Sequence, residues 1–274
     1  MTAKPAWELP GSEAQLNALT REMDEAHRAL LPAMRASAAE HVEELHDTGV
    51  VRSLAAARAA RPDHSLARRG FLLGVGGVGA MGVLAACSAG SGSATPDTRA
   101  GSASAGAYTG DLKLVALATA LENQAVAAYS AALANAKAGK LGTVPPAAST
   151  FMQTAMSQHQ DHAQAWNAVL TGAGQPAISG VPLSNEAATL NAVNSATSTA
   201  AVAKLALSLE NQAAETYLYT VGHVSNTKAI GTAATIAPVE AMHAAILYFV
   251  LGQYPVPDAF LGTDKAANPS TLTV

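Results

Sequence analysis

A five-residue motif, Leu-Glu-Asn-Gln-Ala, occurs at residues 121–125 and again at residues 209–213. Each copy is followed by a pair of residues spaced three apart, and these pairs are His159 and His162, then Glu240 and His243. In a helix, residues three apart lie on one face, about one turn from each other. Carboxylates and imidazoles are both ligands of transition-metal ions. The order Glu, His-x-x-His, Glu, Glu-x-x-His therefore predicts a metal site to which four helices contribute.

This order of residues resembles the ferritin-like superfamily. Its di-iron and di-manganese members take one glutamate from each of two helices and a Glu-x-x-His pair from each of the other two. The resemblance covers about residues 110–252, and it is greatest to the exported branch that includes desiccation-related proteins. It implies an all-α fold, namely a ferritin-like four-helix bundle built from two repeated helix pairs with one long crossover. It also implies a set of metal ligands, which are Glu122, His159, His162, Glu210, Glu240 and His243.

One predicted ligand departs from the family pattern, because His159 stands where that pattern has a glutamate. Four carboxylates would cancel the charge of two divalent ions, whereas three leave a net positive centre. Asp161 is a poor replacement, since two residues along a helix turn it about 200° away. Iron or manganese would suit a dinuclear site, and zinc or copper would suit a site richer in nitrogen. An asymmetric pair of ions and a single firmly held ion both stay open.

The three predicted glutamate ligands fall in the apolar stripes of their helices, where an unpaired charge costs on the order of several kcal/mol. No arginine occurs after Arg99, so protons, the histidines or metal cations must neutralise them. We favour metal ions, and the resemblance adds oxidase or peroxide-related activity as an expectation. The alternative is a metal-free four-helix module of the cell envelope, with a binding or stress-protection role.

Tyr129 and Tyr217 each follow a motif glutamate by seven residues. Seven residues return a helix to nearly the same side, so both tyrosines should share the inner face. We expect them to be core residues whose hydroxyls can orient a metal ligand. Asn123 and Asn211 lie about 100° around the helix from the glutamates, so we expect them at helix contacts.

Four long helices must position these residues, and they are predicted at about 111–138, 146–172, 198–223 and 226–251. The crossover from Ala173 includes a short helix predicted after Ser184. Pro238 falls within the fourth helix, and we expect it either to kink the helix ahead of Glu240 or to mark a late start.

A separate charged segment, residues 1–64, precedes these helices. Ser12 and Gln15 form a predicted capping box for a helix that Pro32 should interrupt. A second helical run holds a cluster of acidic residues and histidines, which is expected to be a solvated face and not a metal site. Its members are Glu40, His41, Glu43, Glu44 and His46. The segment is either a cytosolic extension lost on cleavage or the result of a start codon placed too far upstream.

Residues 65–87 resemble a bacterial export signal. Arg68 and Arg69 look like a twin-arginine motif, and an apolar, glycine-rich run follows them. The run ends at Leu-Ala-Ala-Cys, a lipobox in which Cys87, the only cysteine, would be lipidated after cleavage. The alternatives are a transmembrane helix, for which the run is too short, and an ordinary buried thiol. The expected partners are the twin-arginine export machinery and, through the lipid, the outer face of the cytoplasmic membrane.

Composition separates the remaining segments. Residues 88–107 form a tether of small and polar residues that cannot bury a core. Residues 108–254 are the predicted bundle, and residues 255–274 an extended tail. Residues 88–274 contain seven basic and ten acidic side chains, and this mild negative balance argues against nucleic-acid binding. The sequence indicates no substrate and no protein partner.

Overall fold

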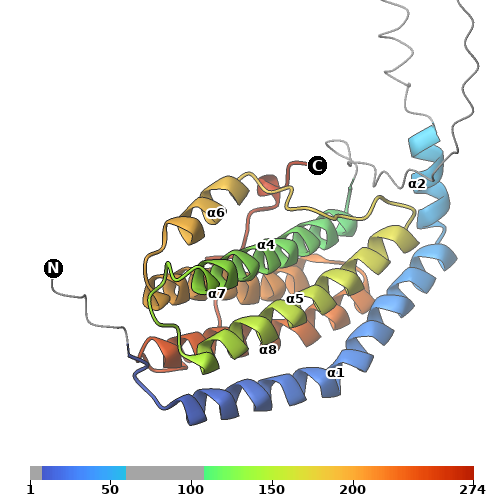
Figure 1. Cartoon of the computed structure of the whole chain (residues 1–274). Coiled ribbons are helices and arrows are strands. Elements are labelled where there is room, and N and C mark those ends of the chain that lie inside the picture. Colours follow the sequence, from blue (N-terminus) through green and yellow to red (C-terminus); the bar gives the residue numbers. More distant parts are fainter. Residues whose placement is uncertain (1–7, 60–107) are drawn as a thin grey trace, which may run out of the picture.

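The computed structural model describes residues 8–59 and 108–274, which form seven α-helices and one short 3-10 helix, with no strand among these residues (Figure 1). The predicted all-α class is confirmed. The elements are α1 Glu13–Asp47, α2 Val50–Ala59, α4 Asp111–Lys137, α5 Pro146–Gly172, α6 Glu186–Ser195, α7 Thr199–His223, α8 Thr227–Val250 and η1 Pro269–Thr271.

Helices α4, α5, α7 and α8 form the four-helix bundle. Short loops join α4 to α5 and α7 to α8, and the helices of each pair pack closely together (Figure 1). Local signals start these helices where the sequence predicts. The Ser198 side chain accepts a hydrogen bond from the Ala201 amide, and the Asn226 side chain accepts from two amides in the first turn of α8. Pro238 lies within a continuous α8, so the alternative of a late helix start is wrong.

The crossover between α5 and α7 carries α6 along the outside of α4. The Asn123 side-chain amide donates to the carbonyls of Ile178 at 3.0 Å and Gly180 at 2.8 Å, which fastens the crossover to α4. Asn211 donates instead to the Tyr248 hydroxyl on α8, at 3.2 Å. Both motif asparagines therefore join elements of the fold.

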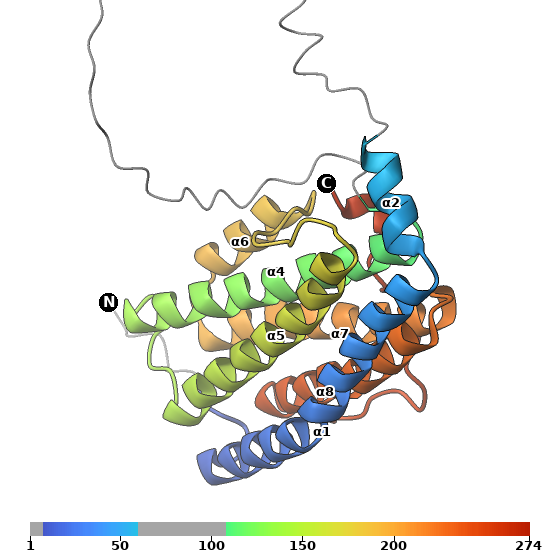
Figure 2. The same cartoon turned by 90° about the vertical axis from the view of Figure 1, so that its right-hand side faces the viewer.

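The long helix α1 lies in the groove between α5 and α8, which contact each other only slightly (Figure 2). It continues through Pro32 without a break, so the predicted interruption is wrong. Its inward residues recur every three or four positions, apart from one interval of seven, and are Leu16, Thr20, Met23, His27, Met34, Ala38, His41 and Leu45. The expected solvated face is also wrong at His41, which is fully buried, although Glu40 and His46 are exposed. The stripe mixes polar and apolar side chains, so the hydrophobic pattern indicates only its apolar members.

The core divides into two apolar layers. One contains Trp166, Leu117 and Ile236, and the other contains Phe151 and Leu247. On each of α4, α5, α7 and α8, the predicted metal ligands fall in sequence between residues of one layer and residues of the other. Apolar packing above and below thus isolates the polar centre from water.

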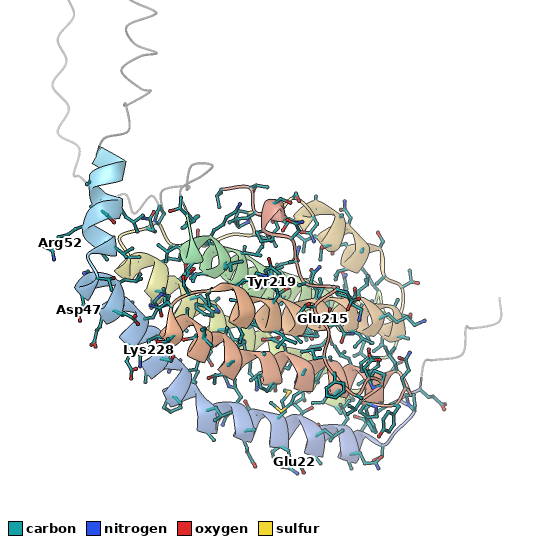
Figure 3. The ribbon with its side chains drawn as sticks, turned by 180° about the vertical axis from the view of Figure 1, so that it is seen from behind. Glu22, Asp47, Arg52, Glu215, Tyr219 and Lys228 are labelled. Atoms are coloured by element: carbon teal, nitrogen blue, oxygen red, sulfur yellow. The ribbon has the colours of Figure 1, made fainter. Side chains whose placement is uncertain are left out.

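The reverse side of the molecule shows α7, α8 and α1 next to one another (Figure 3). Lys228, at the start of α8, forms an ion pair with Glu40 of α1 at 2.5 Å. Among the described helices, α8 is the one long and apolar enough to cross a membrane. It is half buried and carries Glu240 and His243 inward, which is the pattern of a core helix.

Candidate metal centre

All six predicted ligands meet in the middle of the bundle, and none is more than 2% exposed. Helix α4 supplies Glu122 and α7 supplies Glu210, the equivalent residue of the second repeat. The pairs His159 with His162 and Glu240 with His243 come from α5 and α8.

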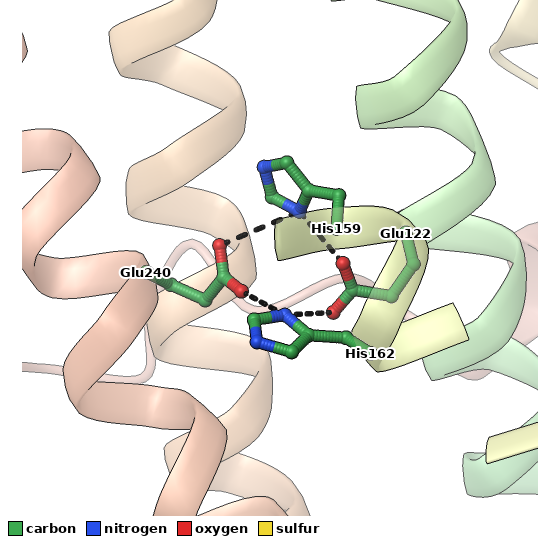
Figure 4. Close-up of side chains that lie close together, drawn as sticks. All are labelled: Glu122, His159, His162 and Glu240. Carbon is green, nitrogen blue, oxygen red and sulfur yellow. Dashed lines mark hydrogen bonds and ion pairs between the residues drawn. The ribbon is translucent and has the colours of Figure 1, made fainter. Parts of the chain in front are cut away.

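One half of the centre is formed around Glu122 (Figure 4). His159 Nδ1 lies 2.6 Å from Glu122 Oε2 and 3.7 Å from Glu240 Oε2. His162 Nδ1 lies 2.9 Å from Glu240 Oε1 and 3.6 Å from Glu122 Oε1. The two carboxylates and the two imidazoles therefore direct their polar atoms at one another.

The other half is formed around Glu210. Its Oε2 lies 3.2 Å from His243 Nδ1, and its Oε1 lies 3.3 Å from His159 Nε2. His243 Nδ1 is also 3.3 Å from Glu240 Oε2. His159 thus presents one ring nitrogen to each half of the centre.

The two halves share two residues, His159 and Glu240. Each half offers four ligand atoms that lie within 4.8 Å of one another. An ion bound about 2.0–2.2 Å from each ligand would hold opposite ligands about 4.4 Å apart, so little movement would be needed. The six residues therefore form two overlapping groups of possible metal ligands.

Opposite charges stabilise one another in this buried cluster. Burial alone would raise the pKa of Glu122, but the imidazoles of His162 and His159 outweigh it and lower that pKa to about 2. Burial alone would lower the pKa of His162, but Glu122 and Glu240 raise it to about 9. By the same opposition, the pKa of Glu210 lies well below its usual value, and that of His159 well above. Glu122 and Glu210 are therefore stabilised as carboxylates, and His159 and His162 as protonated imidazoles, by one another's charges.

The two tyrosines bind the glutamates across the repeat. Tyr129 donates a hydrogen bond to Glu210 Oε1, and Tyr217 donates to Glu122 Oε1. The Tyr217 hydroxyl also accepts from the indole N–H of Trp166 at 2.9 Å. The predicted inner-face position of both tyrosines is confirmed, and each hydroxyl holds a carboxylate of the centre.

Three residues of this region are absent from the sequence prediction. Gln158 is buried beside His243, Asp24 of α1 binds Gln158, and the ring of His27, also on α1, lies 5.3 Å from that of His162. Gln158 directly precedes a predicted ligand, but its neighbours in sequence do not show which way it points. Asp24 and His27 could be found only once α1 was placed against α5.

The match to a known family covers the same helices. The model of the ferritin-like domain matches residues 110–253, just over half of the chain. The chain belongs to the ferritin-like family. A comparison with curated proteins found no significant match, and neither did one with solved structures.

The residues of this ferritin-like centre fit transition-metal ions. Ferritin-like carboxylate sites take their ligands from inward-facing Glu and Glu-x-x-His side chains on four helices, as five of the six positions do here. Two buried ligand atoms, His162 Nδ1 and Glu240 Oε1, make no directional hydrogen bond although they lie 2.9 Å apart. A cation bound by both of these atoms would give each of them a partner.

Proposed function

We propose that this ferritin-like chain binds one or two transition-metal ions in its bundle core. The supporting observation is the pair of four-residue ligand groups that share His159 and Glu240 inside an apolar interior. Iron or manganese would suit a dinuclear site, and the histidine at position 159 extends the choice to zinc or copper.

A redox-active ion bound here would supply oxidase or peroxide-related chemistry. The chain's own contribution is to hold and isolate the ligands. Tyr129 and Tyr217 fix the orientation of one carboxylate each, and the apolar layers around Trp166 and Phe151 keep bulk water out. These contacts orient the two carboxylates even when no ion is bound.

The competing function is a metal-free envelope module with a binding or stress-protection role. The observation that favours this function is the match between three carboxylates and three protonatable imidazoles. Their contacts with one another can stabilise the buried cluster without a metal ion. Metal ions and protons would neutralise the same side chains, and metal binding must displace the protons on the imidazoles. The two functions therefore share one fold and differ in metal content.

Metal analysis of the purified full chain separates the two functions. After expression with iron, manganese and zinc, the wild type should retain one to two ions per chain, and Glu210→Gln should retain fewer. Glu215→Gln is the matched control, because Glu215 lies on the same helix and is buried, but it binds the backbone amide and the ammonium of Lys265 (Figure 3). Trace metal in the wild type would contradict metal binding, and equal loss in both variants would contradict the role of Glu210 as a ligand.

We further propose that the protein belongs to the exported branch of the family and is anchored to the membrane through lipid on Cys87. The support is the sequence of the signal, since Arg68, Arg69, Cys87 and the tether 88–107 lie outside the described residues. Because α1 precedes the signal, cleavage before Cys87 would remove it, so the contacts of α1 with the bundle belong to the full chain before cleavage. Cell fractionation is the test. Cys87→Ala should release the protein from the membrane fraction, and a wild-type protein that stays in the cytosol with residues 1–86 intact would contradict export.

A further inference from the structure

A chain of hydrogen bonds leads from the surface of α1 to the metal centre. The Gln158 side-chain amide nitrogen donates to Asp24 Oδ1 at 3.2 Å. Gln158 Oε1 in turn lies 2.9 Å from His243 Nε2. Gln158 and His243 are both fully buried, and Asp24 lies at the edge of the core, with its side chain 25% exposed.

The chemistry of these groups fixes the direction of each hydrogen bond. An ionised carboxylate has only acceptor atoms, so Asp24 requires the NH₂ group of Gln158 to face it. The oxygen of Gln158 then faces His243 and can only accept, which requires a proton on His243 Nε2. In a neutral imidazole with a proton on Nε2, the lone pair is on Nδ1. That nitrogen is the one that faces Glu210 and Glu240.

We propose that Asp24 is a positioning residue of the metal centre, acting through Gln158 to hold His243 with Nδ1 free for the ion. The proposal rests on the proposed metal binding and extends it, because it makes α1 a part of the centre. Metal-bound histidines commonly donate a hydrogen bond from their other ring nitrogen, which fixes the orientation of the ring. For His243, Gln158 of α5 accepts this bond, and Asp24 of α1 holds Gln158 in place.

The placement of α1 supports this role. The helix fills the groove between α5, which carries Gln158, and α8, which carries His243 (Figure 2). The two oxygens of Asp24 have different partners, because Arg28 pairs with Oδ2 at 2.5 Å while Gln158 binds Oδ1. One turn further along α1, His27 is buried against His162, so α1 contacts one ligand directly and reaches His243 through Gln158.

Zinc titration of the full chain tests the proposal. Asp24→Leu removes the acceptor and should weaken zinc binding about tenfold, the lower end of the loss for such supporting residues. Asp24→Asn keeps an oxygen in the same place and should stay within about threefold of the wild type. Arg28→Gln removes the other partner of Asp24 and should leave the affinity unchanged. Equal losses in Asp24→Asn and Asp24→Leu would show that only the charge matters, which would overturn the proposal.

A second measurement does not depend on bound metal. In the metal-free full chain, the His243 Nε2 proton should exchange slowly with water, and Asp24→Leu should make that exchange faster because Gln158 is then free to rotate. ¹⁵N-resolved NMR of the histidine side chains reports it. If the wild type takes up neither zinc, iron nor manganese, the proposed function fails, and the exchange rate alone then decides whether Asp24 positions His243. Unchanged exchange in Asp24→Leu overturns the proposal, and Asp24→Ala replaces this variant if leucine prevents folding.

Discussion

The hydroxyl of Tyr217 on α7 donates a hydrogen bond to Glu122 on α4, a residue of the other repeat. Tyr129 on α4 donates in the same way to Glu210 on α7. Each repeat therefore supplies the tyrosine that holds the glutamate of its counterpart. This exchange ties the two helix pairs together at the level of the metal centre, where α4 and α7 are in contact.

The two tyrosines should differ in how much they stabilise the fold. Tyr217→Phe should lower the free energy of unfolding by about 1–3 kcal/mol and by more than Tyr129→Phe does. The reason is Trp166, whose buried indole N–H donates to the Tyr217 hydroxyl and would be left without that acceptor. Urea unfolding of both variants measures the difference. An equal or larger loss in Tyr129→Phe would contradict this account.

Position 159 tests the departure from the ferritin-like ligand pattern. His159→Glu restores the fourth carboxylate, whose two oxygens can bind two ions, so metal content should rise towards two ions per chain. Retention of manganese or iron should also increase, because these ions favour oxygen ligands. Metal analysis and a melting curve on this variant give opposite answers under the two functions. In a metal-free core the new carboxylate would be an unpaired buried charge, and a destabilised variant without added metal would argue against metal binding.

Helix α1 should be part of the cooperative fold of the full chain. Leu16→Ala should lower the free energy of unfolding by about 2–5 kcal/mol, because Leu16 is fully buried against the bundle. Leu30→Ala is the matched control on the same helix, since Leu30 is 45% exposed and its loss should cost no more than about 0.5 kcal/mol. Chemical denaturation followed by circular dichroism compares them. Two equally small losses would show that α1 does not pack as described.

His41 should make stability depend on pH. Burial lowers its pKa below the ordinary value of 6.5, and neither ring nitrogen has a hydrogen-bond partner in the structure. The unfolded chain therefore takes up a proton at His41 more readily than the folded chain does. The contribution of His41 to the free energy of unfolding should be complete above about pH 6.5 and should decrease as the pH drops below that value.

The variant His41→Leu removes this contribution. Between pH 7 and pH 5 its free energy of unfolding should fall less steeply than that of the wild type, and at pH 7 it should be no less stable. Urea unfolding at several pH values gives both quantities. Identical slopes for the two proteins would mean that His41 is not buried in the neutral form.

The sequence alone determined the bundle helices and the faces that carry the candidate ligands. Helix starts depend on local groups such as Ser198 and Asn226, which bind amides only two or three residues away. The inner faces follow from helical spacing, which also brings Tyr129 and Tyr217 to the side of the motif glutamates. These signals act within one or two turns, so they can be read without knowing how the chain packs.

Only the tertiary structure decided how the helices share the centre and what α1 does. The pairing of each tyrosine with the glutamate of the other repeat depends on how α4 meets α7. The contact between Asp24 and Gln158 joins residues 134 positions apart, and it forms only because α1 fills the groove between α5 and α8. The apolar residues Leu16 and Met23 indicate one side of α1, but the inward stripe also includes Thr20, His27 and His41, which the hydrophobic pattern does not indicate. Burial of those polar residues depends on the surfaces that meet them, and helical spacing carries no information about those surfaces.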